Sequence, residues 1–118
     1  MSTSLSKFYQ VREEDTVTLK VTIGHAQHAV TAVYLGKDQI VPGHRNSLEL
    51  SIPGSGRELN GKTLYCTTVV ADVRTETNET SVTFELIGGV KPFKQTLQES
   101  VQSEGEVVFY AATFLFWV

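Results

Sequence analysis

Residues 63–73 have the sequence TLYCTTVVADV, which is rich in β-branched residues and carries apolar side chains at both odd and even positions. Such a run is typical of a central strand that is covered on most of its length. On either side of it, apolar and polar residues alternate with a period of two over residues 17–23 and 82–86, as in strands that bury one face. We therefore expect residues 63–73 to form the spine of a β-sheet.

Further strands are expected on both sides of this spine, and Gly, Pro and Asn residues mark the turns between them. Pro42-Gly43 is expected to end one strand, and the polar residues 74–80 to form a turn. Residues 90–101 fit both a helical period of about four and a strand period of two, and we favour a strand because the neighbouring segments are strands. The remaining expected strands cover residues 29–35, 39–41, 48–52 and 106–118.

The length and the pattern of strands together predict the fold class. A chain of 118 residues makes one ordinary domain, here residues 1–118, in which residues 1–7 are expected to be flexible. About seven to nine short strands with turns at regular intervals predict an all-β protein, a single antiparallel β-sandwich. An immunoglobulin-like topology is the leading expectation, and a jelly roll or a small barrel is the alternative.

Charge and cysteine content exclude several classes of protein. The net charge is −3, and no cluster of basic residues is present to neutralise a run of phosphates, so we expect no nucleic-acid partner. Cys66 is the only cysteine, which excludes an intrachain disulfide and indicates a buried, inert thiol.

The two ends of the chain bear on its location. The apolar run at residues 107–118 is shorter than the roughly 20 residues of a membrane helix, so no membrane partner is expected. Residues 1–7 lack the apolar stretch of a secretory signal. These features predict a cytoplasmic protein, or one exported by a route that the sequence does not show.

Residues 56–63, GRELNGKT, match the pattern G-x-x-x-x-G-K-[ST] of phosphate-binding loops. Those loops hold phosphates with backbone N–H groups at the N-terminus of the helix that follows. Here a β-branched strand sequence follows, and a strand supplies no such dipole. We therefore interpret the segment as a hairpin turn around Asn60-Gly61, and we expect no enzyme activity and no cofactor.

Three histidines, His25, His28 and His44, are weak candidate metal ligands, because three neutral imidazoles can form an open zinc site. Histidines exposed in surface loops are the favoured interpretation, so no metal is expected. The carboxylates within residues 72–79 lack the spacing of a calcium loop, and a solvated turn is favoured there.

The last strand, residues 106–118, is unusual because its odd and even positions are both apolar. One face of the strand enters the core, and the other needs a cover. A loop or residues 5–11 provide that cover, or a second subunit does. The sequence does not decide which parity faces inward, and the expected interface residues are Tyr110, Phe114, Phe116, Trp117 and Val118.

These observations predict a non-catalytic β-sandwich that acts in binding or assembly. It self-associates as a homo-oligomer, or docks on another protein, through the apolar C-terminal strand. The alternative is a sandwich that binds a small ligand or carbohydrate with exposed rings such as Tyr34, Tyr65 and Trp117. An enzyme with a metal held by the three histidines is the least favoured hypothesis.

Overall fold

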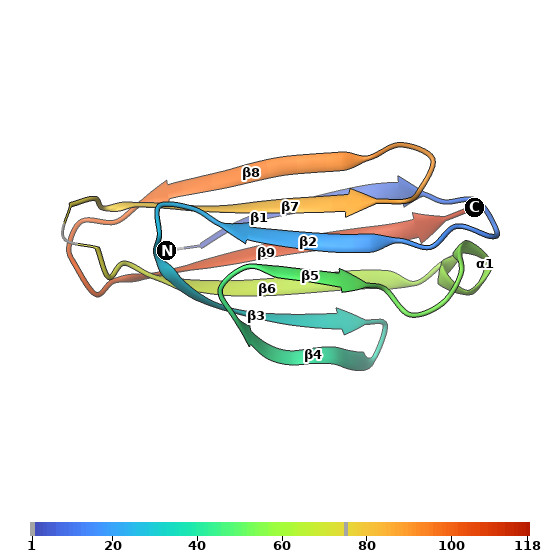
Figure 1. The fold of residues 1–118 in the computed structure, drawn as a ribbon, viewed down its shortest axis with the longest axis horizontal. Coiled ribbons are helices and arrows are strands. Elements are labelled where there is room, and N and C mark those ends of the chain that lie inside the picture. The colour runs from blue at the N-terminus through green and yellow to red at the C-terminus, as the bar shows by residue number, and fades with distance from the viewer. Residues whose placement is uncertain (1, 75) are drawn as a thin grey trace.

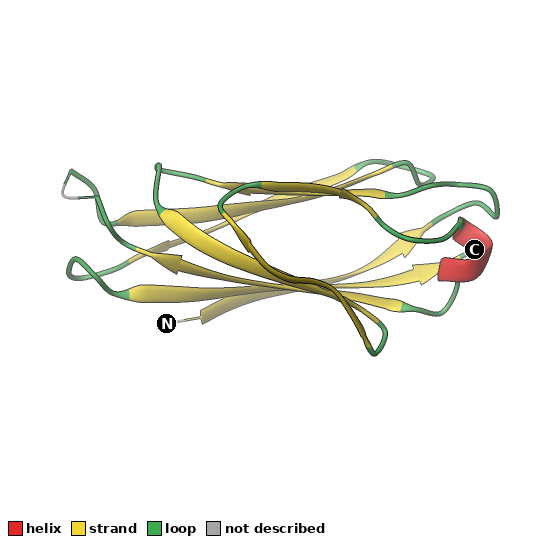
Figure 2. Cartoon of the chain, turned by 60° about the horizontal axis from the view of Figure 1, so that its bottom comes forward, coloured by secondary structure: helices red, strands yellow, loops and turns green. Residues whose placement is uncertain are grey.

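The computed structural model describes residues 2–74 and 76–118, and these residues form a sandwich of two β-sheets (Figures 1 and 2). The described residues make nine strands and one short helix, which are β1 (Ser2–Gln10), β2 (Thr18–Ile23), β3 (His28–Leu35), β4 (Asp38–Arg45), β5 (Leu48–Ser51), α1 (Gly56–Leu59), β6 (Thr63–Ala71), β7 (Glu79–Ile87), β8 (Phe93–Ser100) and β9 (Val107–Trp117). The five-stranded sheet has the order β1-β9-β6-β3-β4, and the four-stranded sheet has the order β5-β2-β7-β8. The expected all-β sandwich is confirmed.

The core lies between the two sheets and is built by strict alternation. β6 lies in the middle of the five-stranded sheet, between β3 and β9, as expected of a spine. Its Leu64, Cys66 and Val70 are buried, while Tyr65 on the opposite face is 41% exposed. Apolar residues of both parities in this strand therefore reflect two apolar surfaces, of which only one is the core.

The N-terminal segment forms a strand that the sequence analysis did not assign. β1 runs parallel to β9 and pairs with it from Ser2 to Gln10, whereas every other strand pairing is antiparallel. Met1, which belongs to the segment expected to be flexible, lies outside the described residues. Leu5 and Tyr9 enter the core. Lys7 on the same parity and Phe8 on the opposite parity break the alternation of apolar and polar residues that would have marked this strand.

One expected strand end is corrected. Pro42-Gly43 does not end β4, which continues to Arg45. β4 is an edge strand, where proline removes no hydrogen bond between inner strands, and shifts of register around Val33 absorb the irregularity.

The strand favoured within residues 90–101 is confirmed as β8. Residue 75, part of the turn expected at residues 74–80, lies outside the described residues.

Residues 56–63 do not form the expected hairpin, because β5 and β6 lie in different sheets. Instead α1 forms a single turn whose N-terminus is closed by Glu58, which accepts a hydrogen bond from the Ser55 N–H at 2.9 Å. This bond lowers the pKa of Glu58. Gly56 donates its N–H to the carbonyl oxygen of Asp15 at 2.8 Å, so α1 is docked on the loop between β1 and β2. No helix in the described ranges has the length and apolar character needed to span a bilayer.

Candidate interaction surface

The structure decides the parity of β9. Tyr110, Phe114 and Phe116 are at most 1% exposed and lie in the core of this chain. These three expected interface residues are therefore not on the surface. Trp117 and Val118, the other two, are 44% and 45% exposed.

The odd residues of β9 point away from the core and lie within a broad outer face. We define the outer face as the side chains of β1, β9, β6, β3 and β4 that point away from the core. Register places Tyr65 of β6 opposite Thr113 of β9, and Val69 opposite Phe109, so their side chains are neighbours on this face. The most exposed large apolar side chains of the outer face are Phe8, Val30, Tyr65, Val107, Phe109 and Trp117.

The outer face is almost free of charge. Among the described residues, its positions on β1, β9, β6 and β3 hold no Asp, Glu, Lys or Arg, and Arg45 stands on the edge strand β4. The water-facing side of the other sheet differs, because Lys20 lies opposite Glu49 on one neighbour and Glu85 on the other. The Lys20 Nζ and Glu49 Oε1 atoms are 3.7 Å apart. The lack of charge is thus a property of one face, not of the whole protein.

The outer face contains two hollows, which arise where small side chains lie among large ones. One hollow of about 340 Å³ lies over Ala111, with Ser4, Thr67 and the larger Tyr65 and Phe109 around it. A second hollow of about 360 Å³ is lined by residues of β3, β4 and β6 and their adjoining loop, among them Val30 and Val69. The outer face therefore presents both protruding rings and recesses.

The three rings considered for ligand binding do not share one hollow. Tyr34 and Tyr65 are neighbours, with ring centroids 6.3 Å apart and planes inclined by 40°. The Tyr34 hydroxyl accepts a hydrogen bond from Gln39 Nε2 at 3.0 Å. Trp117 lies four residues beyond Thr113, the partner of Tyr65, which is about 13 Å along the strand.

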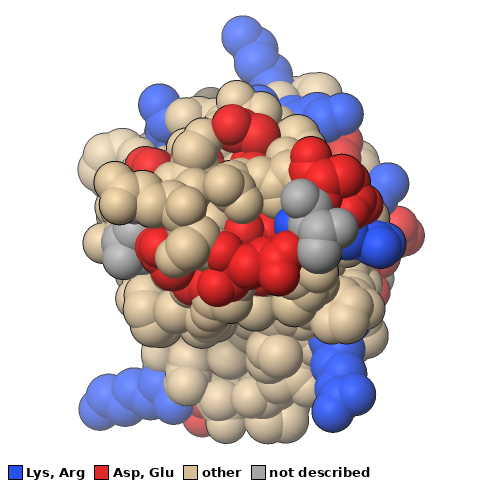
Figure 3. All heavy atoms as spheres, turned by 90° about the vertical axis from the view of Figure 1, so that its left-hand side faces the viewer, with Lys and Arg blue, Asp and Glu red and all other residues tan. Residues whose placement is uncertain are grey.

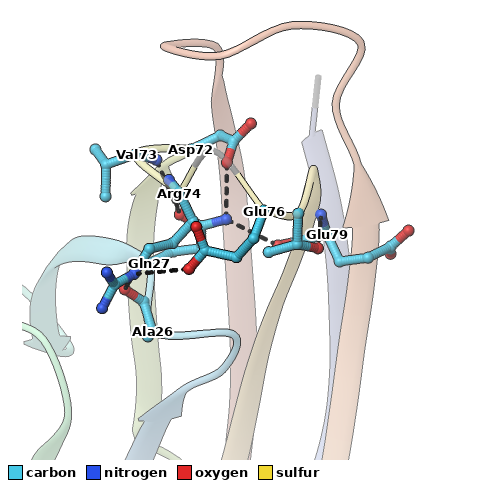
Figure 4. A network of polar contacts seen from close by, with 8 residues as sticks. Ala26, Gln27, Asp72, Val73, Arg74, Glu76 and Glu79 are labelled. Carbon is cyan, nitrogen blue, oxygen red and sulfur yellow. Dashed lines mark hydrogen bonds and ion pairs between the residues drawn. The ribbon is translucent and has the colours of Figure 1, made fainter.

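A buried amide, which the sequence analysis did not single out, organises one end of the sandwich (Figure 4). Gln27 is 3% exposed, and its Nε2 donates to Asp72 Oδ1 at 2.8 Å and to the Glu79 carbonyl oxygen at 3.1 Å. Its Oε1 accepts the N–H groups of Val73 at 2.9 Å and Arg74 at 3.2 Å. Gln27 thus ties the turn before β3 to the segment between β6 and β7. No local pattern marks it, because its partners are about 45 residues away in the chain.

Carboxylates gather near the centre of this same end (Figure 3). The end of β6 and the β8–β9 loop meet there, since the Gly105 N–H donates to the Asp72 carbonyl oxygen at 2.8 Å. Asp72 is 1% exposed, and its Oδ2 has no hydrogen-bond partner among the residues that the structure describes. Within the described part of the chain, no three His, Cys, Asp or Glu side chains are arranged to hold a metal ion.

The three histidines considered as metal ligands are all exposed. His25 is exposed in the turn before β3, His28 is exposed at the start of β3, and His44 is exposed on β4. The His44 Nε2 lies 3.0 Å from the carbonyl oxygen of Ser47. The described residues do not bring these imidazoles together as a metal site.

Cys66 is buried in the core, as expected, and burial raises the pKa of its thiol to about 12. A thiol that remains protonated at neutral pH is a poor nucleophile.

Comparisons of the chain with models of protein families, with curated proteins and with solved structures find no match. The functional argument therefore rests on the geometry and chemistry of the outer face.

Proposed function

We propose that this protein is a non-catalytic assembly module that associates with a second copy of itself through the outer face. The observation that carries the proposal is the lack of charged side chains at the outward positions of four neighbouring strands. A sheet face in water normally carries polar and charged residues, as the four-stranded sheet does here. The exposed apolar side chains of such an uncharged face are stabilised when a partner covers them.

The size of the outer face fits a stable interface. β6 has nine residues and β9 has eleven, and at about 3.3 Å per residue these strands are roughly 30 to 36 Å long. Five strands about 4.8 Å apart span about 24 Å. The product is roughly 700 to 900 Å² per copy, close to the approximately 800 Å² that each partner buries in a standard interface.

Chemistry favours a second copy as the partner. A strongly charged partner surface would lose hydration against the outer face and find almost no charged side chains to pair with. The outer face itself is a suitable partner, because it is almost uncharged and exposes apolar side chains. A two-fold contact, which places a surface against itself, brings no carboxylates or lysines of these strands into like-charge contact.

The proposal is tested by molar mass in solution, measured by light scattering after size exclusion at two concentrations. We expect a stable multiple of 13.0 kDa for the wild type. Phe109→Lys places a charge on the outer face and is expected to yield a folded monomer. Ile87→Lys is the matched control, because Ile87 is an exposed apolar residue of the other sheet, 39% exposed against 51% for Phe109.

The control variant is expected to keep the mass of the wild type. A wild type that is monomeric at both concentrations, or a Phe109→Lys variant with unchanged mass, contradicts self-association through the outer face. Circular dichroism of each variant establishes that it is folded. Docking on another protein is the alternative that a monomeric wild type would favour.

An immunoglobulin-like arrangement belongs to this proposal. In immunoglobulin domains, strands C, F and G share one sheet, and strand B lies between A and E in the other. Here β3, β6 and β9 are neighbours in one sheet, and β2 lies between β5 and β7 in the other. This order supports equating β2, β3, β5, β6 and β9 with B, C, E, F and G, with the β7–β8 hairpin at the position of strand A.

A cytoplasmic location is also proposed. Its support is Cys66, which is free and buried. A reducing compartment suits a small domain that is held together by its core without a disulfide. Fractionation of cells that produce the protein tests this point.

Binding of a small ligand or a carbohydrate is the second candidate function. The observation that favours it is the hollow over Ala111, where hydroxyl groups of Ser4 and Thr67 lie beside the rings of Tyr65 and Phe109. Hydroxyls and exposed rings are suited to sugars. The test is to measure the melting temperature with each of a panel of sugars. A sugar that raises the melting temperature of the wild type, but not that of a Tyr65→Ala variant, would support this function over assembly.

A further inference from the structure

Resting on the self-association proposed above, we infer that two copies stack face to face with their β9 strands antiparallel. In this arrangement Phe109 of each copy enters the hollow over Ala111 of the other. The assembly is closed at two copies, because each outer face is used once.

Edge-to-edge assembly is disfavoured at every edge of the two sheets. Among the described strands, β1, β4, β5 and β8 form the edges. β1 places the exposed Lys7 on the side of the strand that faces the core, and β8 places Glu99 on its core-facing side. β4 contains Pro42 and shifts of register, and β5 has only four residues. These are the devices by which sheets avoid pairing with another chain, so the uncharged face is the surface left for assembly.

The outer face is complementary to itself. Phe109 protrudes and is 51% exposed, and the hollow of about 340 Å³ lies over Ala111, two residues along the same strand. A cavity of about 150 Å³ holds benzene, so this hollow accepts a phenyl ring. Ring and hollow are about 7 Å apart along the strand. With a two-fold axis that crosses β9 at Tyr110, the Phe109 ring of each copy therefore enters the hollow of the other copy.

The acidic end of the sandwich favours the antiparallel orientation. Carboxylates gather near the centre of one end of the long axis (Figure 3), where Asp72 and Gly105 meet and where Arg74 forms an ion pair with Glu76 at 4.0 Å. Parallel stacking would place two such ends side by side, and like charges at short range repel. Antiparallel stacking places them at opposite ends of the dimer. The opposite end of each copy carries charges of both signs, including the ion pair of Arg57 with Glu13 at 2.9 Å.

Engineered cysteines distinguish these arrangements. With the axis at Tyr110, Val107 of one copy lies opposite Thr113 of the other, and two copies of Val107 lie about 20 Å apart. We compare Val107→Cys, Thr113→Cys and the double variant, treated under native conditions with a short bis-maleimide and separated on a denaturing gel. Cys66 is buried and is retained. Thr22→Cys, exposed on the other sheet, is the control for collisional cross-linking.

We expect covalent dimer from the double variant and from an equimolar mixture of the two single variants. Each single variant alone is expected to give no more dimer than the Thr22→Cys control. Dimer from each single variant alone would overturn the antiparallel orientation, and a ladder of larger species would overturn closure. A wild type of dimeric mass without any cross-link at these positions would overturn face-to-face stacking, whereas a monomeric wild type would mean that self-association itself fails.

Discussion

At the scale of single residues, Gln27 shows how one buried amide holds three segments together. It donates to Asp72 Oδ1 and to the Glu79 carbonyl oxygen, and it accepts two backbone N–H groups. Gln27→Glu keeps the shape but replaces the donor beside Asp72 with a second carboxylate oxygen. We expect a loss of about 2 to 4 kcal/mol in the free energy of unfolding at neutral pH, measured by urea denaturation.

Gln98→Glu is the matched control for this prediction. Gln98 is exposed on β8, so the same change of charge is expected to alter stability by less than about 0.5 kcal/mol. Acidification protonates the introduced carboxyl group of Gln27→Glu and restores a donor, so its deficit relative to the wild type should shrink. Equal losses in the two variants would contradict the role assigned to Gln27.

Because Cys66 is buried, we expect the stability of the protein to fall at alkaline pH. Burial raises the pKa of its thiol from 9.0 to about 12, so the native state keeps a proton that the unfolded state releases. The stabilisation is present below pH 9 and is lost as the pH rises toward 12, at about 1.4 kcal/mol per pH unit. We therefore expect the stability advantage of the wild type over Cys66→Ala to fall in that window.

Urea denaturation of both proteins at neutral pH and in this alkaline window checks the difference. Tyr9 and Tyr110 also have raised pKa values, mainly because of burial, but they titrate in both proteins and cancel in the comparison. A wild-type advantage that stays constant with pH would mean that the thiol is accessible to water in the native state.

At the scale of elements, α1 depends on a close approach of two backbones. A methyl group on Gly56 would overlap the carbonyl oxygen of Arg12, and the Gly56 N–H donates to the Asp15 carbonyl oxygen. Gly56→Ala is therefore expected to lower the free energy of unfolding by about 1 to 3 kcal/mol or more. The first glycine of the GRELNGKT segment is needed for this contact, and the segment does not precede a helix.

Gly43→Ala is the control, because a methyl group there would make an ordinary contact of 3.5 Å with Val30 Cγ1. We expect Gly43→Ala to change stability by less than about 0.5 kcal/mol. Thermal or urea unfolding of the two variants provides the comparison. A Gly56→Ala variant as stable as the Gly43→Ala variant would show that α1 can move away from the loop without cost.

Local patterns predicted the inner elements better than the peripheral ones. β7 was evident from its alternation, because one face of the strand is buried against the other sheet, and β6 was evident from its run of β-branched and apolar residues. β1 and β4 lie at edges, where one neighbour is missing and serine or proline is tolerated. The docking of α1 depends on Arg12 and Asp15, more than 40 residues earlier in the chain, and no local pattern encodes that distance.

At the scale of the whole molecule, the two sheets have opposite characters on their water-facing sides. One side carries the Lys20 and Glu49 pair, and the other is almost uncharged, with exposed rings and two hollows. Carboxylates gather near the centre of one end of a body 47 Å long, whereas the other end carries charges of both signs. This asymmetry gives the protein one surface suited to assembly and a polarity along its long axis, which together set the geometry proposed for the dimer.

The sequence by itself determined that this chain is an all-β sandwich with a buried, unpaired cysteine, because alternation and β-branched residues are local signals of burial. Only the tertiary structure decided which side of β9 is inside. Both parities of that strand are apolar, so no period separates them. Pairing with β1 and β6 and packing against the four-stranded sheet place Tyr110, Phe114 and Phe116 in the core. The same packing leaves Phe109 and Trp117 exposed on the outer face.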